Sequence, residues 1–431
     1  MKSLFVALIV GSIFQLARPE VVSAQQQAPA SQAEMIQTLL NRIDQLERRV
    51  AELEAPHAAA ASTAPAAVAT QAAATAQKST SPMAVMDMNH PESQPAVDGP
   101  NLKIAGFSDF NFGASDVPGS KSGFSEGQFI LHMNSRLSSK VSFMGEISLT
   151  ARPDAGTGTP PATGFNAEVE RTIIRYEHND HFKASFGRFH TPINYWNTTY
   201  HHGQWLQTTV GRPEMTQFGG KFIPVHFVGA LVEGAVGASG LNLNYNFGVG
   251  NGRGNVISRG GDAGDNNNNR AWLVNMFVKP DRLYGLQLGG STYRDKINTG
   301  GNAYGEWITS AHVVWARENP ELIAEFANVN HENLITPSPR SNSQAYYVQA
   351  AYRLPHMEKR LKPYYRYEYI HIPLSDTLFQ SQGVPSLSGS IIGGRFDAST
   401  FAAFKLEYRN QRRAPNVPRV NSVFVQTSFT F

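Results

Sequence analysis

The chain contains no cysteine among its 431 residues. The absence of thiols excludes structural disulfides, thiolate zinc sites and cysteine nucleophiles, and it also excludes a lipoprotein anchor attached through cysteine. Long runs of basic residues are missing as well, so the charge pattern does not indicate nucleic-acid binding. Any activity of this protein must rest on other chemistry.

Long apolar runs are scarce after the N-terminus. Hydrophobic residues make up 41% of the chain and the mean hydropathy is −0.31. No stretch of about eighteen apolar residues predicts a transmembrane helix. The first 24 residues combine a basic start at Lys2, an apolar core, and the small residues Val22, Ser23 and Ala24 before Gln25. This pattern predicts a secretory signal peptide over 1–24 that is cleaved after Ala24.

Apolar and polar residues alternate along many short segments from residue 101 onward. Between 241 and 250, Leu241, Leu243, Tyr245, Phe247 and Val249 alternate with asparagines and glycines. The same period of two appears at 140–150 and at 402–409. Alternation of this kind predicts β-strands with one apolar and one polar face.

The sequence divides into about sixteen such strands between 101 and 431, most of them near the roughly 9 to 11 residues that a tilted strand needs to cross a bilayer. Short connections alternate with long ones, which include 190–225, 251–269, 294–304 and 372–388. A two-layer sandwich also shows period-two patterning, but it does not require turns of alternating length. We therefore predict an all-β transmembrane barrel of about 16 antiparallel strands over 101–431.

The chain ends in the strand pattern VFVQTSFTF, residues 423–431. Phe431, Phe429, Thr427, Val425 and Val423 share one face, and Phe424 is the exception on the other. This terminal strand resembles the closing strand of bacterial outer-membrane barrels, whose last aromatic residue is part of the signal for assembly. The resemblance implies that role for Phe431.

Residues 25–54 predict a short α-helical coiled coil. Its apolar positions are spaced alternately by three and four residues, with β-branched residues and leucines in alternation. That arrangement by itself favours a dimer, whereas two consecutive Arg-apolar-x-x-apolar-Glu segments resemble short trimeric coiled coils; a lone amphipathic helix is the alternative. The residues concerned are Ile36, Leu39, Arg42, Ile43, Leu46, Glu47, Arg49, Val50, Leu53 and Glu54.

Residues 55–100 consist largely of Ala, Pro, Thr, Ser and Gln, which predicts a low-complexity linker. Within it, the segment Met83 to His90 places three methionines near a histidine. Thioether and imidazole ligands suit copper(I), but a few apolar residues in a linker are the simpler interpretation. We expect no metal and no cofactor.

The barrel segment carries 31 basic and 25 acidic residues. Confined rings of one charge bias the ions that enter a pore, so this excess predicts a mild anion preference. The charged residues expected to face the lumen are Lys140, Glu146, Lys183, Arg353, Arg366, Glu368, Lys405, Glu407 and Arg409.

Signal peptide, coiled coil, linker and sixteen predicted strands together resemble trimeric bacterial outer-membrane porins with an N-terminal periplasmic coiled coil, including the phosphate-selective type. The resemblance implies a homotrimer embedded in outer-membrane lipid, with its coiled coil in the periplasm. It also implies passive diffusion of small hydrophilic solutes and no catalytic residues. A structural tether that contacts the cell wall through the coiled coil is an alternative, and an outer-membrane enzyme is a further one.

In sixteen-stranded porins the third external loop follows the fifth strand and folds into the barrel. The segment 190–225 matches this loop in order, side and length, and it is rich in aromatic and charged residues. The resemblance implies a pore constriction here, while a loop packed on itself or on a neighbouring subunit is the alternative. The candidate constriction residues are Tyr195, Trp196, His201, His202, Trp205, Arg212, Glu214 and Lys221.

Overall fold

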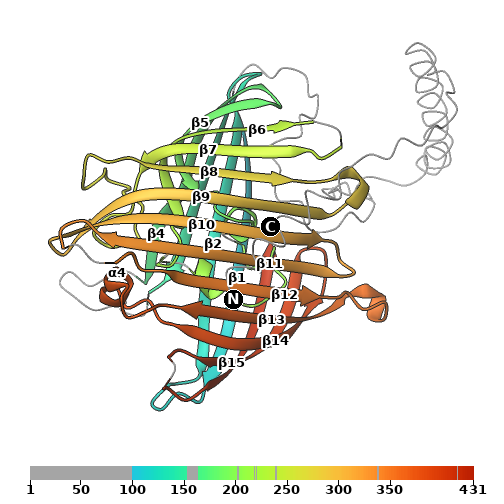
Figure 1. The fold of residues 1–431 in the computed structure, drawn as a ribbon. Helices are drawn as coiled ribbons and strands as arrows, with labels where there is room; N and C mark the ends of the chain where they lie inside the picture. The colour runs from blue at the N-terminus through green and yellow to red at the C-terminus, as the bar shows by residue number, and fades with distance from the viewer. Residues whose placement is uncertain are drawn as a thin grey trace, which may run out of the picture. The chain divides into compact units, whose positions relative to one another are not determined.

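The computed structural model describes residues 100–152, 164–200, 203–217, 219, 221–237, 240–336, 339–414 and 416–431. The predicted signal peptide, the coiled coil and nearly all of the linker, residues 1–99, lie outside the described residues. The described residues form a closed antiparallel barrel in which each strand pairs with the next and β16 pairs with β1 (Figure 1). The predicted sixteen-stranded barrel is confirmed.

The strands cover most of the described chain. In order they are β1 Asn101–Ser115, β2 Gly123–Arg136, β3 Val141–Ala151, β4 Phe165–Asn179, β5 Phe182–His190, β6 His226–Val236, β7 Leu243–Asn251, β8 Ala271–Val278, β9 Leu286–Thr299, β10 Asn302–Ala316, β11 Glu321–Asn333, β12 Ser343–Ala351, β13 Leu361–His371, β14 Leu387–Asp397, β15 Ala402–Arg412 and β16 Val420–Thr430.

The described helices are short and lie in connections. They are α3 Trp196–Thr199, α4 Thr377–Ser381 and the 3-10 helices η1 Glu214–Thr216, η2 Asp281–Leu283 and η3 Met357–Lys359. In the described part of the chain, none of them has the length and apolar character of a membrane-crossing helix.

The barrel has apolar side chains outside and charged side chains inside. On β15, Phe404 and Leu406 are 50% and 57% exposed, whereas Lys405 and Glu407 between them are 2% and 0% exposed. Because strand side chains alternate between two faces, the predicted period of two places one set outward and the other inward. This distribution is the reverse of a water-soluble protein and matches a barrel with a lipid-facing surface.

The C-terminal residue helps to close the barrel. Phe431 and Gly106 on β1 exchange two backbone hydrogen bonds, with N···O distances of 2.9 and 3.1 Å. The ring of Phe431 packs near that of Phe129, with 5.5 Å between centroids. Phe424, the exception in the terminal pattern, lies beneath the guanidinium of Arg409 at 4.3 Å from ring centroid to Cζ.

The predicted long connection at 294–304 is wrong. β9 and β10 continue as a hairpin to Thr299 and Asn302, joined only by Gly300 and Gly301. Both glycines have positive φ, 58° and 78°, as a two-residue hairpin turn of the primed type requires. The charged residues Arg294 and Lys296, interpreted as loop, instead extend the strand.

Candidate functional site

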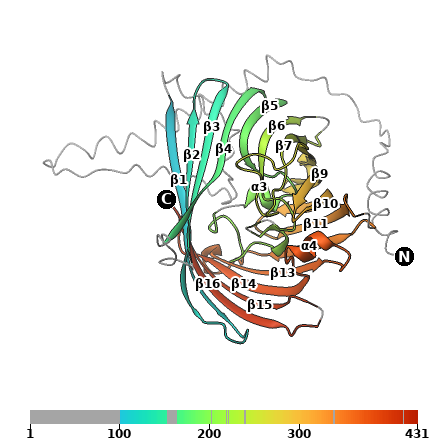
Figure 2. The ribbon, with the colours of Figure 1, turned by 90° about the vertical axis from the view of Figure 1, so that its left-hand side faces the viewer.

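The segment between β5 and β6 folds into the barrel as predicted from its position. Its neck is closed by a hydrogen bond from the Thr191 N–H to the Val225 carbonyl, at 2.9 Å. Asn197 donates from Nδ2 to the same two residues' carbonyl oxygens, at 2.7 and 3.1 Å. Figure 2 shows α3 within the ring of strands. We call residues 191–225 the inner loop.

Apolar side chains pack the inner loop against the barrel wall. Ile193, Trp196 and Ile223 are completely buried and belong to one cluster with inward-facing residues of β3 to β6 and β8 to β14. The ring of Trp196 meets that of Tyr347 on β12 edge to face, with 5.9 Å between centroids. Because these large apolar side chains are completely buried, the inner loop is a packed part of the barrel interior.

Carboxylates of the wall accept hydrogen bonds from backbone N–H groups of the inner loop. Glu325 on β11 accepts from Tyr195 N at 2.7 Å and from Trp196 N at 2.6 Å. Glu407 on β15 accepts from Val210 N at 3.0 Å, and Glu368 on β13 accepts from Glu214 N at 3.2 Å.

Lysine and arginine side chains of the barrel wall also hold the inner loop, because they donate hydrogen bonds to its carbonyl oxygens. Arg366 donates to Gly211 O at 2.9 Å, and Arg395 donates to Gln207 O at 3.0 Å. Lys405 donates to Thr209 O at 3.1 Å. Each of these side chains is 4% exposed or less, so desolvated charges are compensated by the loop backbone.

The structure buries three of the eight predicted constriction residues against the wall. Tyr195, Trp196 and Arg212 are buried, and burial lowers the pKa of Arg212 to about 9, an effect opposed by Glu170 and Glu325. Arg212 is therefore cationic at neutral pH. His201 and His202 lie outside the described residues.

Three predicted constriction residues lie nearer to solvent. Trp205 stacks with Phe107 at a centroid distance of 6.4 Å. Glu214 pairs with Arg413 at 3.0 Å. Lys221 donates to the carbonyl of Gln382 at 2.9 Å. A role for these residues in a constriction remains a prediction.

The predicted lumen charges are inward except for two. Glu146, Lys183, Arg366, Glu368, Lys405 and Glu407 are buried, and Arg409 is held on the inner side by an ion pair of 2.6 Å with Glu407. Lys140 lies in the exposed turn before β3 rather than in the strand. Arg353 lies beyond the end of β12, where it pairs with Glu318 and Asp397, each at 2.6 Å.

The buried ionic groups do not form a cationic interior. Among the described residues, eight lysines and arginines and ten carboxylates are buried, although the segment 101–431 has a basic excess overall. Many buried cations have a carboxylate partner, for example Arg366 with Glu368 at 2.6 Å. The excess of lysine and arginine over carboxylates therefore lies on partly or fully exposed positions.

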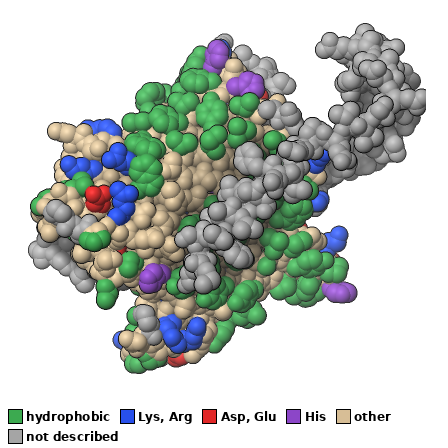
Figure 3. Space-filling model, in the orientation of Figure 1, with side chains coloured by type: hydrophobic (Ala, Val, Ile, Leu, Met, Phe, Trp, Pro, Cys, Tyr) green, Lys and Arg blue, Asp and Glu red, His purple; other side chains and the backbone are tan. Residues whose placement is uncertain are grey.

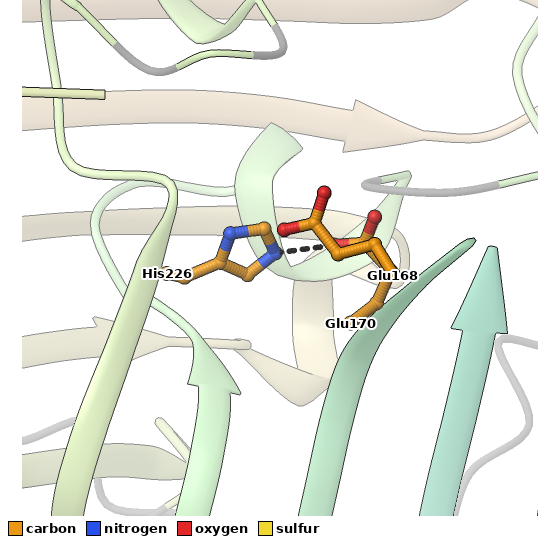
Figure 4. Close-up of side chains that lie close together, drawn as sticks. All are labelled: Glu168, Glu170 and His226. Atoms are coloured by element: carbon orange, nitrogen blue, oxygen red, sulfur yellow. Dashed lines mark ion pairs between the residues drawn. The ribbon is translucent and has the colours of Figure 1, made fainter. Parts of the chain in front are cut away.

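A carboxylate and histidine cluster lies where β5 parts from β4. Glu168, Glu170 and His226 bring their ligand atoms within 4.8 Å of one another (Figure 4). A register shift beside Glu170 turns Glu170 and Arg171 to the same side of β4. Arg188 enters the cluster, with Nη2 at 2.9 Å from Glu168 and 3.1 Å from His226 Nδ1. The guanidinium thus supplies a positive charge beside the two carboxylates.

A second cluster fastens the connection that contains α4. Asp376 accepts from Ser343 Oγ at 2.6 Å and lies 2.9 Å from His331 Nδ1. His331 Nε2 lies 3.0 Å from Glu306, and Glu306 pairs with Arg253 at 2.9 Å. Sequence reasoning missed both clusters because their members are separated by tens of residues and follow no local motif.

The comparisons with known proteins concern the fold. No protein-family model matches the chain, and no curated protein matches it. Salmonella typhi OmpF, solved in complex with daunomycin, aligns with 14% identity and a TM-score of 0.53 over 78% of this chain and 98% of its own. The outer membrane channel DcaP of Acinetobacter baumannii aligns with 11% identity and a TM-score of 0.51 over 77% and 98%. OmpT, an outer membrane protein of Vibrio cholerae in its trimer form, aligns with 12% identity and a TM-score of 0.50 over 78% of this chain and 100% of its own. These likenesses show a shared barrel fold.

Proposed function

We propose that this protein is an outer-membrane porin that lets small hydrophilic solutes diffuse passively, with a mild anion preference. One observation carries the proposal: a closed barrel exposes apolar residues outward while it holds buried charges and a pinned loop inside. Such a barrel separates a polar interior from lipid and leaves no open sheet edge.

Aromatic residues on the outer face support a membrane location. Trp307 and Trp315 lie on the same outward face of β10, eight residues apart. Eight residues of strand extend about 27 Å, which a tilt of about 40° reduces to roughly 20 Å, similar to the apolar band of roughly 25 Å. Trp and Tyr favour the two membrane interfaces.

The pathway for solutes follows the wall of β2 to β4. Gln128, Thr150 and Arg171 face inward there and remain partly exposed. The described hydrogen bonds of the inner loop instead reach β9, β11 and β13 to β16. Trp205 of the loop also stacks on Phe107 of β1, so the space for solutes lies between the inner loop and the wall of β2 to β4.

Exposed cations near the external mouth account for a mild anion preference. Arg259 is 60% exposed and Arg413 is 52% exposed as side chains, and each has one carboxylate partner. Because the buried charges inside the barrel compensate one another, the electrostatic field at its external opening comes mainly from such exposed cations.

A homotrimer is part of the proposal, held together by the barrel and by the coiled coil of residues 25–54. Three heptads are short for an isolated coiled coil, so the two contacts support each other. The coiled coil would extend into the periplasm, with contact to the cell wall as a further role.

Conductance in planar lipid bilayers tests this proposal. We expect stepwise insertion of open channels and, in a potassium chloride gradient, a reversal potential of the sign given by chloride permeation. A folded protein that inserts without conducting would refute the channel and favour the tether. A reversal potential of zero or of opposite sign would refute the anion preference alone.

A further inference from the structure

The outer face of β9 carries two cations at the same end of the barrel as α4. Tyr293 and Asp295 are 1% and 2% exposed, so their side chains point inward. Strand alternation then directs Arg294 and Lys296 outward. These two residues lie in the part of the strand that the sequence had suggested to be a loop.

Arg294 lies directly between two tryptophans. Its register partners are Trp272 on β8 and Trp307 on β10, and the two indole rings meet edge to face with 5.5 Å between centroids. Tryptophans on the outer face of a barrel mark the level of the lipid headgroups. Arg294 therefore lies at this level, and Lys296 lies one pleat further out.

The positive charges of Arg294 and Lys296 are little compensated by carboxylates of the protein. Among the described residues, neither Arg294 nor Lys296 forms an ion pair. Arg270, which precedes β8 by one residue, pairs with Asp265 at 2.8 Å, and its side chain is 50% exposed. Figure 3 shows lysine and arginine side chains gathered at the left-hand end of this face, beside hydrophobic side chains. We call Arg270, Arg294 and Lys296 the outer-rim basic patch.

We propose that the outer-rim basic patch binds the phosphate groups of a phosphorylated glycolipid in the outer leaflet. The inference rests on the proposed outer-membrane location. Guanidinium groups match phosphate oxygens with two parallel hydrogen bonds, and a lysine adds a mobile point charge. Trp272 and Trp307 flank Arg294 with an apolar surface, where the acyl chains of such a lipid begin.

The opposite end of the same strand pair differs. There, Lys279 lies over the ring of Phe277 at 5.3 Å, and Asp281 stands next to Arg282 in η2. The charges are mixed and the turn is short. Arg282 is exposed and provides a matched control, because it is a cation on the same hairpin at the other end of the barrel.

The test is a lipid titration of the full-length protein in non-ionic detergent, read by native mass spectrometry. The probes are bisphosphorylated lipid A and the same lipid with both phosphates removed. We expect preference for the phosphorylated lipid, and we expect R294Q/K296Q to weaken its binding about thirtyfold, since each cation contributes about 1 kcal/mol near an anionic surface. R282Q should bind like the parent protein.

Equal binding of the two lipids, parental binding by R294Q/K296Q, or an equal loss of binding in R282Q would overturn the proposal. Displacement of the lipid by inorganic phosphate at constant ionic strength would also overturn it, because it would indicate a site for free anions. Channel conductance of R294Q/K296Q should equal that of the parent, which shows that the variant is folded. A parent protein without conductance would refute the proposed channel while the lipid titration still decided this site.

Discussion

Glu325 holds Trp196 by its backbone: one carboxylate oxygen on β11 lies 2.6 Å from the amide nitrogen of Trp196 at the start of α3. The same oxygen accepts from Tyr195 N at 2.7 Å. A wall carboxylate thus fixes the point at which the inner loop turns back.

Replacing Glu325 with alanine should loosen the inner loop. Two buried N–H groups would lose their acceptor, at a cost of about 1 to 3 kcal/mol each. We expect a lower melting temperature and noisier single-channel currents for E325A. E325Q keeps an oxygen acceptor and should lie between E325A and the parent; identical behaviour of E325A and the parent would contradict the anchoring role.

Acid should release the connection that contains α4. Burial alone raises the pKa of Asp376, but hydrogen bonds from His331, Ser343 and the Phe379 N–H outweigh it, so the pKa lies below its ordinary value of 3.8. A carboxyl group with a depressed pKa stabilises the fold fully above its unfolded value and loses this contribution as pH falls through the folded one. Proteolysis within 372–386 should therefore increase below pH 3.8.

The variant D376N provides the control for this pH dependence. It removes the titrating group, so the connection should be cleaved to the same extent above and below pH 3.8. If D376N retains the parent's acid transition, another group is responsible.

Neutralising exposed cations at the mouth should weaken anion preference. R259Q/R413Q removes two exposed charges without emptying a buried ion pair, so the reversal potential in a salt gradient should move toward zero while conductance changes little. R366Q leaves Glu368 without its buried partner and should lower stability instead, by about 3 to 5 kcal/mol. A reversal potential unaffected by R259Q/R413Q would show that selectivity arises elsewhere.

Deleting Phe431 should affect assembly more than permeation. The residue contributes a backbone pair with Gly106 and a ring contact, a loss of at most about 3 to 5 kcal/mol by analogy with a buried Phe truncation. We expect a lower amount of folded barrel in cells but normal conductance from the protein that does fold. Unchanged outer-membrane levels would count against an assembly signal.

Deleting residues 25–100 should leave trimeric barrels of lower thermal stability. In the proposed trimer, the coiled coil would join three chains and thereby lower the entropic cost of association. Light scattering in detergent gives the oligomeric state, and heating before electrophoresis gives the stability. Intact protein that is monomeric in detergent would disprove the trimer.

The sequence was sufficient to predict the strands because alternation of the kind seen at Phe404, Lys405, Leu406 and Glu407 is a local signal. It also predicted the inner loop from its place in the order of connections. It could not predict that Arg366 and Lys405 bind loop carbonyls, because those contacts span more than 150 residues. The charged residues at 294–296 led to a wrong prediction of where β9 ends, because polar residues of a strand that lie beyond its apolar segment resemble those of a loop.

Side chains of the barrel wall hold the inner loop mainly through its backbone: Glu325, Glu407, Arg366 and Lys405 all bind peptide groups, and Arg366 also donates to the side chain of Thr209. Every amino acid except proline supplies the same peptide groups. Loop residues that do not pack against the wall are therefore open to substitution without loss of the loop's path, and the permeation properties can be retuned on a backbone that stays in place.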